Sequence, residues 1–261
     1  MNVLEFINEF DIAYNNIRSN GAPGLDLYEQ SVFLSKAQEQ LVFNYFDPKS
    51  NIRNDGFENS EKRRRGLEKL IKNYYTNNEN SLIEDVPDLS GIPLENFNNY
   101  FVKIPGNVFF VIQESSYLKD NNDILYNTIK TIPVTHDEIM LQEENPFRKP
   151  NIDGVSKRVW RVDNSLGTFT DSVEIVTPVG FSLINYQMRY IEKPTPIILT
   201  DLTSGDFTGM GLSIDGITDE TDCKLSSLVH RQIVDRAVEL AKESFEVASL
   251  QTSLIMSSRN E

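Results

Sequence analysis

The sequence predicts an α+β fold, in which N-terminal helices and a long C-terminal helix flank an inserted antiparallel β domain. Apolar residues recur at helical spacing near both ends of the chain, whereas the middle holds short β-branched and aromatic runs bounded by Gly, Pro, Asn and Asp. The longest run alternates Tyr186, Met188 and Tyr190 with polar residues, which is typical of a half-buried strand. Pro194 and Pro196 follow, and strand pairing should stop there because proline donates no ladder hydrogen bond.

Helices are expected in the first part of the chain at residues 3–17 and from residue 27 onward. Asp26 and Glu29 have the spacing of a capping box, and Pro48 should end the second helix. A third helix should begin after Ser60, with an apolar stripe at Leu67, Leu70, Ile71 and Tyr74.

The last helix is predicted from residue 227 to about residue 256. Its stripe is rich in Ala and Ser, so we expect it to pack closely against another helix.

The middle of the chain should contain several short strands. We expect them at residues 101–105, 108–113, 124–134, 158–162 and 173–177. The turn Thr177-Pro178-Val179-Gly180 should join the last of these to the long strand as a hairpin.

These elements suggest a division into domains. Residues 1–80 should pack with residues 224–261, residues 94–200 should form the inserted β domain, and the Gly- and Asp-rich residues 201–223 should be a loop or arm.

Composition restricts the class of function. The chain has 261 residues and a net charge of -14, which argues against a general nucleic-acid coat because phosphate binding relies on basic side chains. Cys223 is the single cysteine, so an internal disulfide and a cysteine-rich zinc site are excluded. No apolar run is long enough for a membrane span and no signal peptide is evident, so we expect a soluble protein inside the cell that makes it.

One concentrated basic run stands out in this acidic chain, at Lys62, Arg63, Arg64 and Arg65. Cations in the first turns of a helix oppose its macrodipole, so a partner for them is worth considering. A solvated helix face is one interpretation, and contact with an acidic partner surface or with passing DNA is the other.

His136, Asp137 and Glu138 bring an imidazole and two carboxylates together in the sequence. Such groups can bind a divalent metal or transfer protons, so a metal-assisted hydrolase is an alternative function. Adjacent residues of an extended segment point to opposite faces, however, and no second metal-ligand spacing accompanies them. A surface turn or a subunit contact is therefore the preferred interpretation, and we expect neither a metal nor a cofactor.

Residues 145–150 have proline near both ends and carry Phe147 and Arg148 between them. This stiff segment suits a fixed crossing or a docking strand better than a flexible linker. A protein-binding module that presents the β domain to a partner is a further alternative function.

Several short segments of the sequence, in this order, resemble segments of virion proteins of crAss-like phages, which are short-tailed phages of gut Bacteroidales. They are Tyr28-Glu29, Phe33 to Gln38, Ser60 to Arg64, His136 to Glu138, Asn145 to Pro150, Trp160-Arg161, Arg189 to Pro194 with Pro196 to Leu199, and Arg236 to Ala241. Helices at both ends of an inserted β domain also resemble the head-to-tail adaptor proteins of short-tailed phages.

This resemblance implies a non-enzymatic, ring-forming virion protein of about twelve copies. It further implies docking below the portal beside other tail-ring proteins, with DNA passing through the ring only as cargo. On this reading the interface residues would include the basic run, His136 to Glu138, Phe147 and Arg148.

Overall fold

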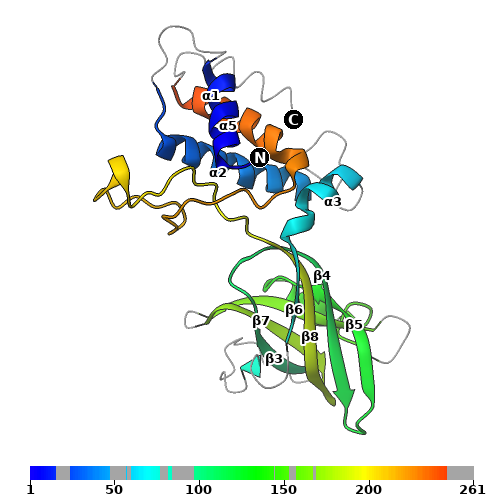
Figure 1. The fold of residues 1–261 in the computed structure, drawn as a ribbon. Coiled ribbons are helices and arrows are strands. Elements are labelled where there is room, and N and C mark those ends of the chain that lie inside the picture. The colour runs from blue at the N-terminus through cyan, green and yellow to red at the C-terminus, as the bar shows by residue number, and fades with distance from the viewer. Residues whose placement is uncertain are drawn as a thin grey trace. The chain divides into compact units, whose positions relative to one another are not determined.

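The computed structural model describes residues 1–15, 24–47, 57, 60–76, 82–83, 97–143, 145–152, 157–166 and 169–245. The chain forms two compact units (Figure 1). The helical unit comprises Met1–Leu70 with Pro194–Glu261, and the sheet unit comprises Ile71–Lys193. The predicted α+β class, with helices at both ends of the chain around a sheet, is confirmed.

The helical unit contains four α-helices among its described residues. They are α1 (Val3–Asn15), α2 (Leu27–Phe46), α3 (Glu61–Leu67) and α5 (His230–Phe245). Short 3-10 turns add η3 (Glu68–Leu70), η4 (Gly205–Phe207) and η5 (Ser227–Val229). Asp26 begins α2 with the predicted capping box, in which Asp26 Oδ1 accepts from the Glu29 backbone N–H at 2.7 Å.

Helix α5 packs against α1 and α2. Ile233, Ala237 and Ala241 are fully buried on α5, and Phe6 and Phe10 of α1 are buried as well. The Ala-rich stripe of α5 therefore packs against helices of the same unit. The predicted ends of the first and last helices, at residues 17 and 256, lie outside the described residues.

Polar side chains on one face of α2 fix the extended segment that follows Pro194. Ser31 Oγ accepts from the Leu199 N–H, Ser35 Oγ accepts from the Ile197 N–H, both at 3.0 Å, and Gln38 Nε2 donates to the Thr195 carbonyl at 2.7 Å. These three residues lie on one stripe of α2 because their spacings are four and three. These side chains provide hydrogen-bond partners for backbone N–H and C=O groups of the segment that would otherwise be buried without partners. The segment therefore lies along α2.

The loop after Leu199 is closed at its base. Ile198 and Thr221 exchange backbone hydrogen bonds of 3.3 and 3.0 Å, and the Leu202 N–H donates to the Thr218 carbonyl at 2.9 Å. Leu202 and Cys223 are buried. Residues 200–222 therefore form a loop of turns anchored on the helical unit.

The predicted third helix is wrong at its C-terminal end. Helix α3 ends at Leu67, η3 follows, and Ile71–Tyr75 form strand β1 of the sheet. Ile71 pairs with Ile191 and Tyr74 pairs with Met188, so the apolar pattern of this segment is satisfied by strand pairing. The chain thus passes from one unit to the other at residue 70.

Among its described residues, the sheet unit contains eight strands in one curled sheet, of order β1-β8-β4-β5-β6-β7-β3-β2. The other strands are β2 (Leu82–Ile83), β3 (Phe97–Lys103), β4 (Val108–Asp120), β5 (Leu125–Pro133), β6 (Arg158–Leu166), β7 (Phe169–Pro178) and β8 (Phe181–Glu192). Every pairing is antiparallel except that of β5 with β6, which are parallel. A short helix, α4 (Ile139–Glu143), lies in the β5–β6 connection, as parallel strands require a crossover.

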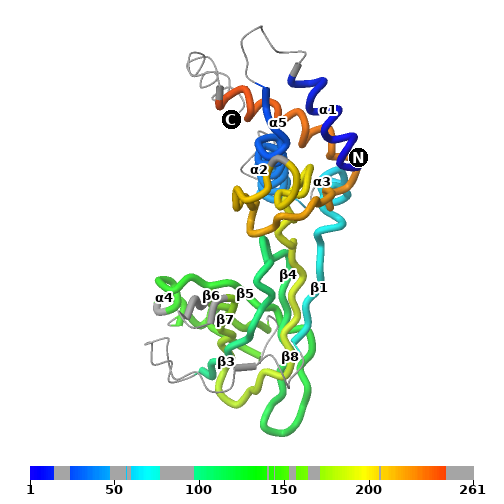
Figure 2. The backbone as a smooth tube through the Cα atoms, turned by 60° about the vertical axis from the view of Figure 1, so that its left-hand side comes forward, coloured from blue at the N-terminus to red at the C-terminus, as the bar shows by residue number. Residues whose placement is uncertain are grey.

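The long strand predicted from the alternating aromatics is β8. Tyr186 and Met188 are fully buried, Tyr190 is nearly so, and β8 ends at Glu192 just before Pro194. These side chains belong to the main core, which fills the concave side of the sheet together with residues such as Leu118 and Ile175. Figure 2 shows how β6, β7 and β3 turn away from the plane of β1, β8 and β4.

The hairpin predicted from the turn at Thr177–Gly180 is wrong. Strand β7 pairs with β6 and β3, whereas β8 pairs with β1 and β4. At the turn, the Phe181 carbonyl accepts from the side chains of Asn98, Tyr100 and Thr177, at 3.2 to 3.3 Å. The Phe181 carbonyl is thus bonded to side chains and not to the backbone of β7. Strands β7 and β8 therefore separate after the turn, and the sheet curls.

Candidate assembly surfaces

Helix α3 carries the basic run on the outside of the helical unit. Lys62, Arg64 and Arg65 are exposed and Arg63 is half-buried. Arg65 forms an i,i+4 ion pair of 2.7 Å with Glu61, and the Arg63 guanidinium lies 5.9 Å from the centre of the Tyr45 ring. We call the exposed side chains of Lys62, Arg64 and Arg65 the basic surface.

Tight packing holds α3 against the end of α2. A Cβ on Gly66 would lie 2.9 Å from Tyr45 Cε2 and 3.1 Å from Val229 Cγ1, so only glycine fits at this contact. Tyr45 donates to Gln232 Oε1 of α5 at 2.7 Å, and burial raises the pKa of its hydroxyl despite the Arg63 charge. The basic surface is therefore presented by a fixed element of the fold.

His136, Asp137 and Glu138 lie in an exposed turn before α4. His136 Nε2 lies 2.8 Å from the Asp163 carbonyl oxygen, where an Nε2–H would donate, and Glu138 Oε2 accepts from Gln142 at 3.1 Å. The three side chains do not converge on one point with other ligands. Among the residues that the structure describes, no group of three His, Cys, Asp or Glu side chains is placed to hold a metal ion.

Phe147 and Arg148 lie in a second turn, after α4, which is held on the sheet. The Arg148 and Lys149 N–H groups both donate to the Asn145 carbonyl at 3.0 Å, and Trp160 Nε1 donates to the Arg148 carbonyl at the same distance. The Phe147 side chain is 81% exposed. This turn therefore presents an aromatic side chain to solvent from a rigid base.

The two turns are fixed to neighbouring residues of β6. The first contacts Asp163 through His136, and the second contacts Trp160. Trp160 is fully buried in a small core with Val162 of β6 and Ile139 of α4. The structure thus anchors the turn of His136 to Glu138 and the turn of Phe147 and Arg148 on one strand, while the basic surface belongs to the helical unit.

Sequence reasoning missed a buried ionic cluster in the sheet unit. Glu114 of β4 accepts from Arg161 Nη1 at 2.7 Å and also from the Tyr186 hydroxyl. The side chains of Glu114 and Arg161 are only 4% and 11% exposed. Although desolvation opposes its charge, Arg161 has a raised pKa because of Glu114 and, further away, Asp163.

Tyr186 is held neutral in this cluster. Burial and then the Glu114 charge raise the pKa of its hydroxyl, so it acts as a hydrogen-bond donor to the carboxylate. Glu114 was not detectable from the sequence because a single Glu in a strand is usually exposed. Its pairing with Arg161 joins strands β4 and β6, which are separated in the sheet by β5.

Cys223 and His230 are structural residues of the helical unit. Cys223 Sγ donates to Gln38 Oε1 at 3.3 Å, and burial raises the pKa of this thiol to about 11, which keeps it unreactive. His230 Nε2 donates to the Leu225 carbonyl at 3.1 Å, and its Nδ1 accepts from the Met1 amino group at 2.8 Å.

Within the described residues, no helix combines the length and the apolar character needed to cross a membrane.

Comparison with known proteins identifies the family of this chain. The family model for phage tail ring protein 3/4 matches residues 1–253. The chain is 36% identical over 266 residues to "Ring protein 4/5" of Bacteroides phage crAss001, with 100% of both chains covered. It is also 34% identical over 239 residues to "Ring protein 3" of the same phage, covering 91% of this chain and 93% of that one. This chain therefore belongs to the phage tail ring protein 3/4 family.

Proposed function

We propose that copies of this chain assemble into a closed ring that forms one layer of a phage tail. The observation that carries the proposal is the match to two ring proteins over more than nine-tenths of the chain. The match spans both the helical unit and the inserted sheet, so the relatives share the whole architecture and not one module. A subunit that contacts the next through two different surfaces forms a closed ring when the rotation between them closes.

The ring would lie at the head-to-tail junction, docked below the portal among other tail rings and lining the DNA channel. The net charge of -14 supports this position, because a negative wall repels DNA and lets it slide. We propose about twelve copies, the number that the adaptor resemblance implies. The turns that carry His136 and Phe147 would contact a neighbouring subunit or ring, since they are exposed and rigidly held.

Electron microscopy of the purified chain tests ring formation. Negative-stain class averages at high protein concentration should show closed rings, and mass photometry should give their copy number. The same sample mixed with a purified portal should join the portal ring. A chain that stays monomeric at every concentration, and that leaves the portal unchanged, would contradict the proposal.

The channel role has a separate test. Because DNA should pass without being retained, the assembled ring should give no stable complex with double-stranded DNA in a gel-shift measurement at about 0.15 M salt. Tight, salt-sensitive binding by the ring would show that its wall holds DNA, and the channel role would have to be abandoned.

A further inference from the structure

Two surfaces of opposite charge lie at opposite ends of helix α2. The first is the basic surface on α3. The second is the loop of residues 200–222, which contains acids but neither Lys nor Arg. We call Asp201, Asp215, Asp219 and Glu220 the acidic surface; Asp222 is left out because the next residue, Cys223, contacts Gln38 in the middle of α2.

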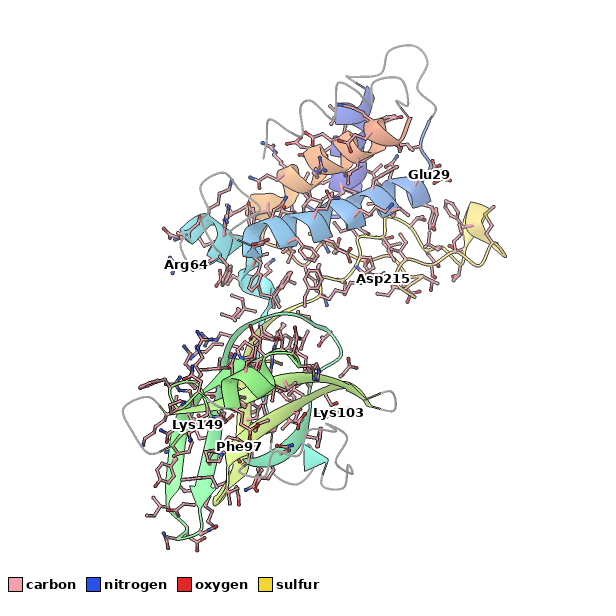
Figure 3. All side chains as sticks on the ribbon, turned by 180° about the vertical axis from the view of Figure 1, so that it is seen from behind. Glu29, Arg64, Phe97, Lys103, Lys149 and Asp215 are labelled. Atoms are coloured by element: carbon pink, nitrogen blue, oxygen red, sulfur yellow. The ribbon has the colours of Figure 1, made fainter. Side chains whose placement is uncertain are left out.

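Contacts to α2 give the separation of the two surfaces. Gly66 of α3 touches Tyr45, near the C-terminal end of α2. The chain enters the acidic loop at Leu199, whose N–H donates to Ser31 near the N-terminal end. From Ser31 to Tyr45 the helix rises by about 21 Å at ~1.5 Å per residue. Figure 3 shows Arg64 beside one end of α2 and Asp215 toward the other.

Both surfaces carry charges that are available for an external partner. Asp219 and Glu220 are exposed, and no ion pair joins them to another described residue. The same holds for Lys62 and Arg64. Asp201 stays ionised because hydrogen bonds from Thr203 lower its pKa.

Each charged surface also has an exposed apolar side chain beside it. Met210 of the acidic loop is 62% exposed. Leu228 is 60% exposed in η5, which adjoins α3 because the Ser226 N–H donates to the Gly66 carbonyl at 3.4 Å. An apolar contact surrounded by charged residues is the usual composition of a protein interface.

From this arrangement we propose that the acidic surface of one subunit docks on the basic surface of the next copy. The proposal rests on ring formation and adds which faces meet. Two different faces on opposite sides of a unit make a heterologous contact, which closes into a ring when the rotation permits. The acidic surface cannot meet a second acidic surface, so the charges also fix the direction of each subunit around the ring.

Charge reversal on each side, alone and together, tests the pairing. Wild-type chain, K62E/R64E, D219K/E220K and the combined four-residue variant would be compared by sedimentation velocity and negative-stain microscopy. We expect each single-sided reversal to weaken assembly by about tenfold or more, because like charges then face each other. The combined variant should regain rings, since opposite charges are restored in the reversed sense.

The matched control is K103E/K130E, which changes the net charge by the same amount as K62E/R64E at two exposed lysines of the sheet unit, outside the turns proposed to make contacts. It should assemble like wild type. Assembly of wild type should also weaken at about 1 M salt, where the Debye length is ~3 Å. If a reversal variant loses its helical circular dichroism, the neutral K62Q/R64Q variant replaces it and should show a smaller loss of assembly.

The outcomes separate the two proposals. Wild-type chain that never forms rings contradicts ring formation itself. Rings that persist in both single-sided variants, or that the combined variant fails to restore, overturn the docking of these two faces while leaving ring formation intact. If wild-type rings retained DNA and K62E/R64E rings did not, the basic surface would contact nucleic acid, and the inference would equally be overturned.

Discussion

The buried ion pair between Glu114 and Arg161 should make the sheet unit very sensitive to the loss of one partner. In Arg161→Met the apolar stem remains, but Glu114 loses its cation while its side chain is still only 4% exposed. Breaking a buried pair in this way costs about 3–5 kcal/mol of unfolding free energy, because an uncompensated charge is left behind. The second contact of Arg161, with the 77% exposed Asp163, adds little to this cost.

The assay follows the fluorescence of Trp160 during urea unfolding. Trp160 is the single tryptophan, is fully buried and lies in the sheet unit, so its emission reports unfolding of that unit alone. With a slope of about 2 kcal/mol/M, the midpoint should fall by about 1.5–2.5 M. Lys130→Met, at an exposed lysine of β5, is the control and should leave the midpoint within about 0.3 M of wild type.

A double variant separates the charge effect from general damage. Glu114→Gln combined with Arg161→Met removes both charges, so it should be more stable than the sum of the two single effects predicts. A fall of less than about 0.5 M in Arg161→Met would refute the reasoning, because the pair would then be solvated or replaceable. Strict additivity in the double variant would refute it as well.

Three further predictions concern the helical unit. Burial lowers the pKa of His230, so the unfolded chain binds a proton on this imidazole more readily than the folded chain does. The free energy of unfolding should therefore be highest above pH ~6.5, the ordinary pKa of histidine, and should decrease as the pH falls below it. Urea midpoints from helical circular dichroism at pH ~7 and ~5 measure this loss, and His230→Gln should reduce the difference. Cys223 should react with a thiol reagent only on unfolding, because it is buried with a pKa raised to about 11, and rapid labelling of native protein would contradict this. Asp26→Ala should lower the unfolding free energy by about 1 kcal/mol through loss of the capping box, whereas Asp235→Ala, at an exposed position inside α5, should change it little.

The local parts of the fold were predictable because their signals are local. The Asp26 and Glu29 spacing gave the start of α2, and the alternation of Tyr186, Met188 and Tyr190 gave the buried face of β8. The prolines after Glu192 correctly predicted the end of that strand. In each case the deciding contact lies within a few residues, so the pattern alone contains the information.

Errors arose where a distant partner decided between two compatible patterns. Ile71 and Tyr74 fit a helical stripe as well as a short strand, and pairing with β8 selected the strand. The turn at residues 179–180 predicted a hairpin, but side chains from β3 and β7 bind the Phe181 carbonyl and separate β7 from β8. The parallel pairing of β5 with β6 likewise depends on the crossover that contains α4.

The candidate surfaces show the same division. Charge and the stiffness of proline are properties of residue type, so the sequence alone indicated the basic run at Lys62–Arg65 and the stiff segment around Phe147. It could not show that His136 and Phe147 are anchored on one strand, or that α2 holds an acidic loop and a basic helix at opposite ends. By itself the sequence determined the helical and extended elements and the overall negative charge. Only the tertiary structure decided which charges became neighbours and which became opposite faces, because those positions depend on hydrogen bonds and packing between residues far apart in the chain.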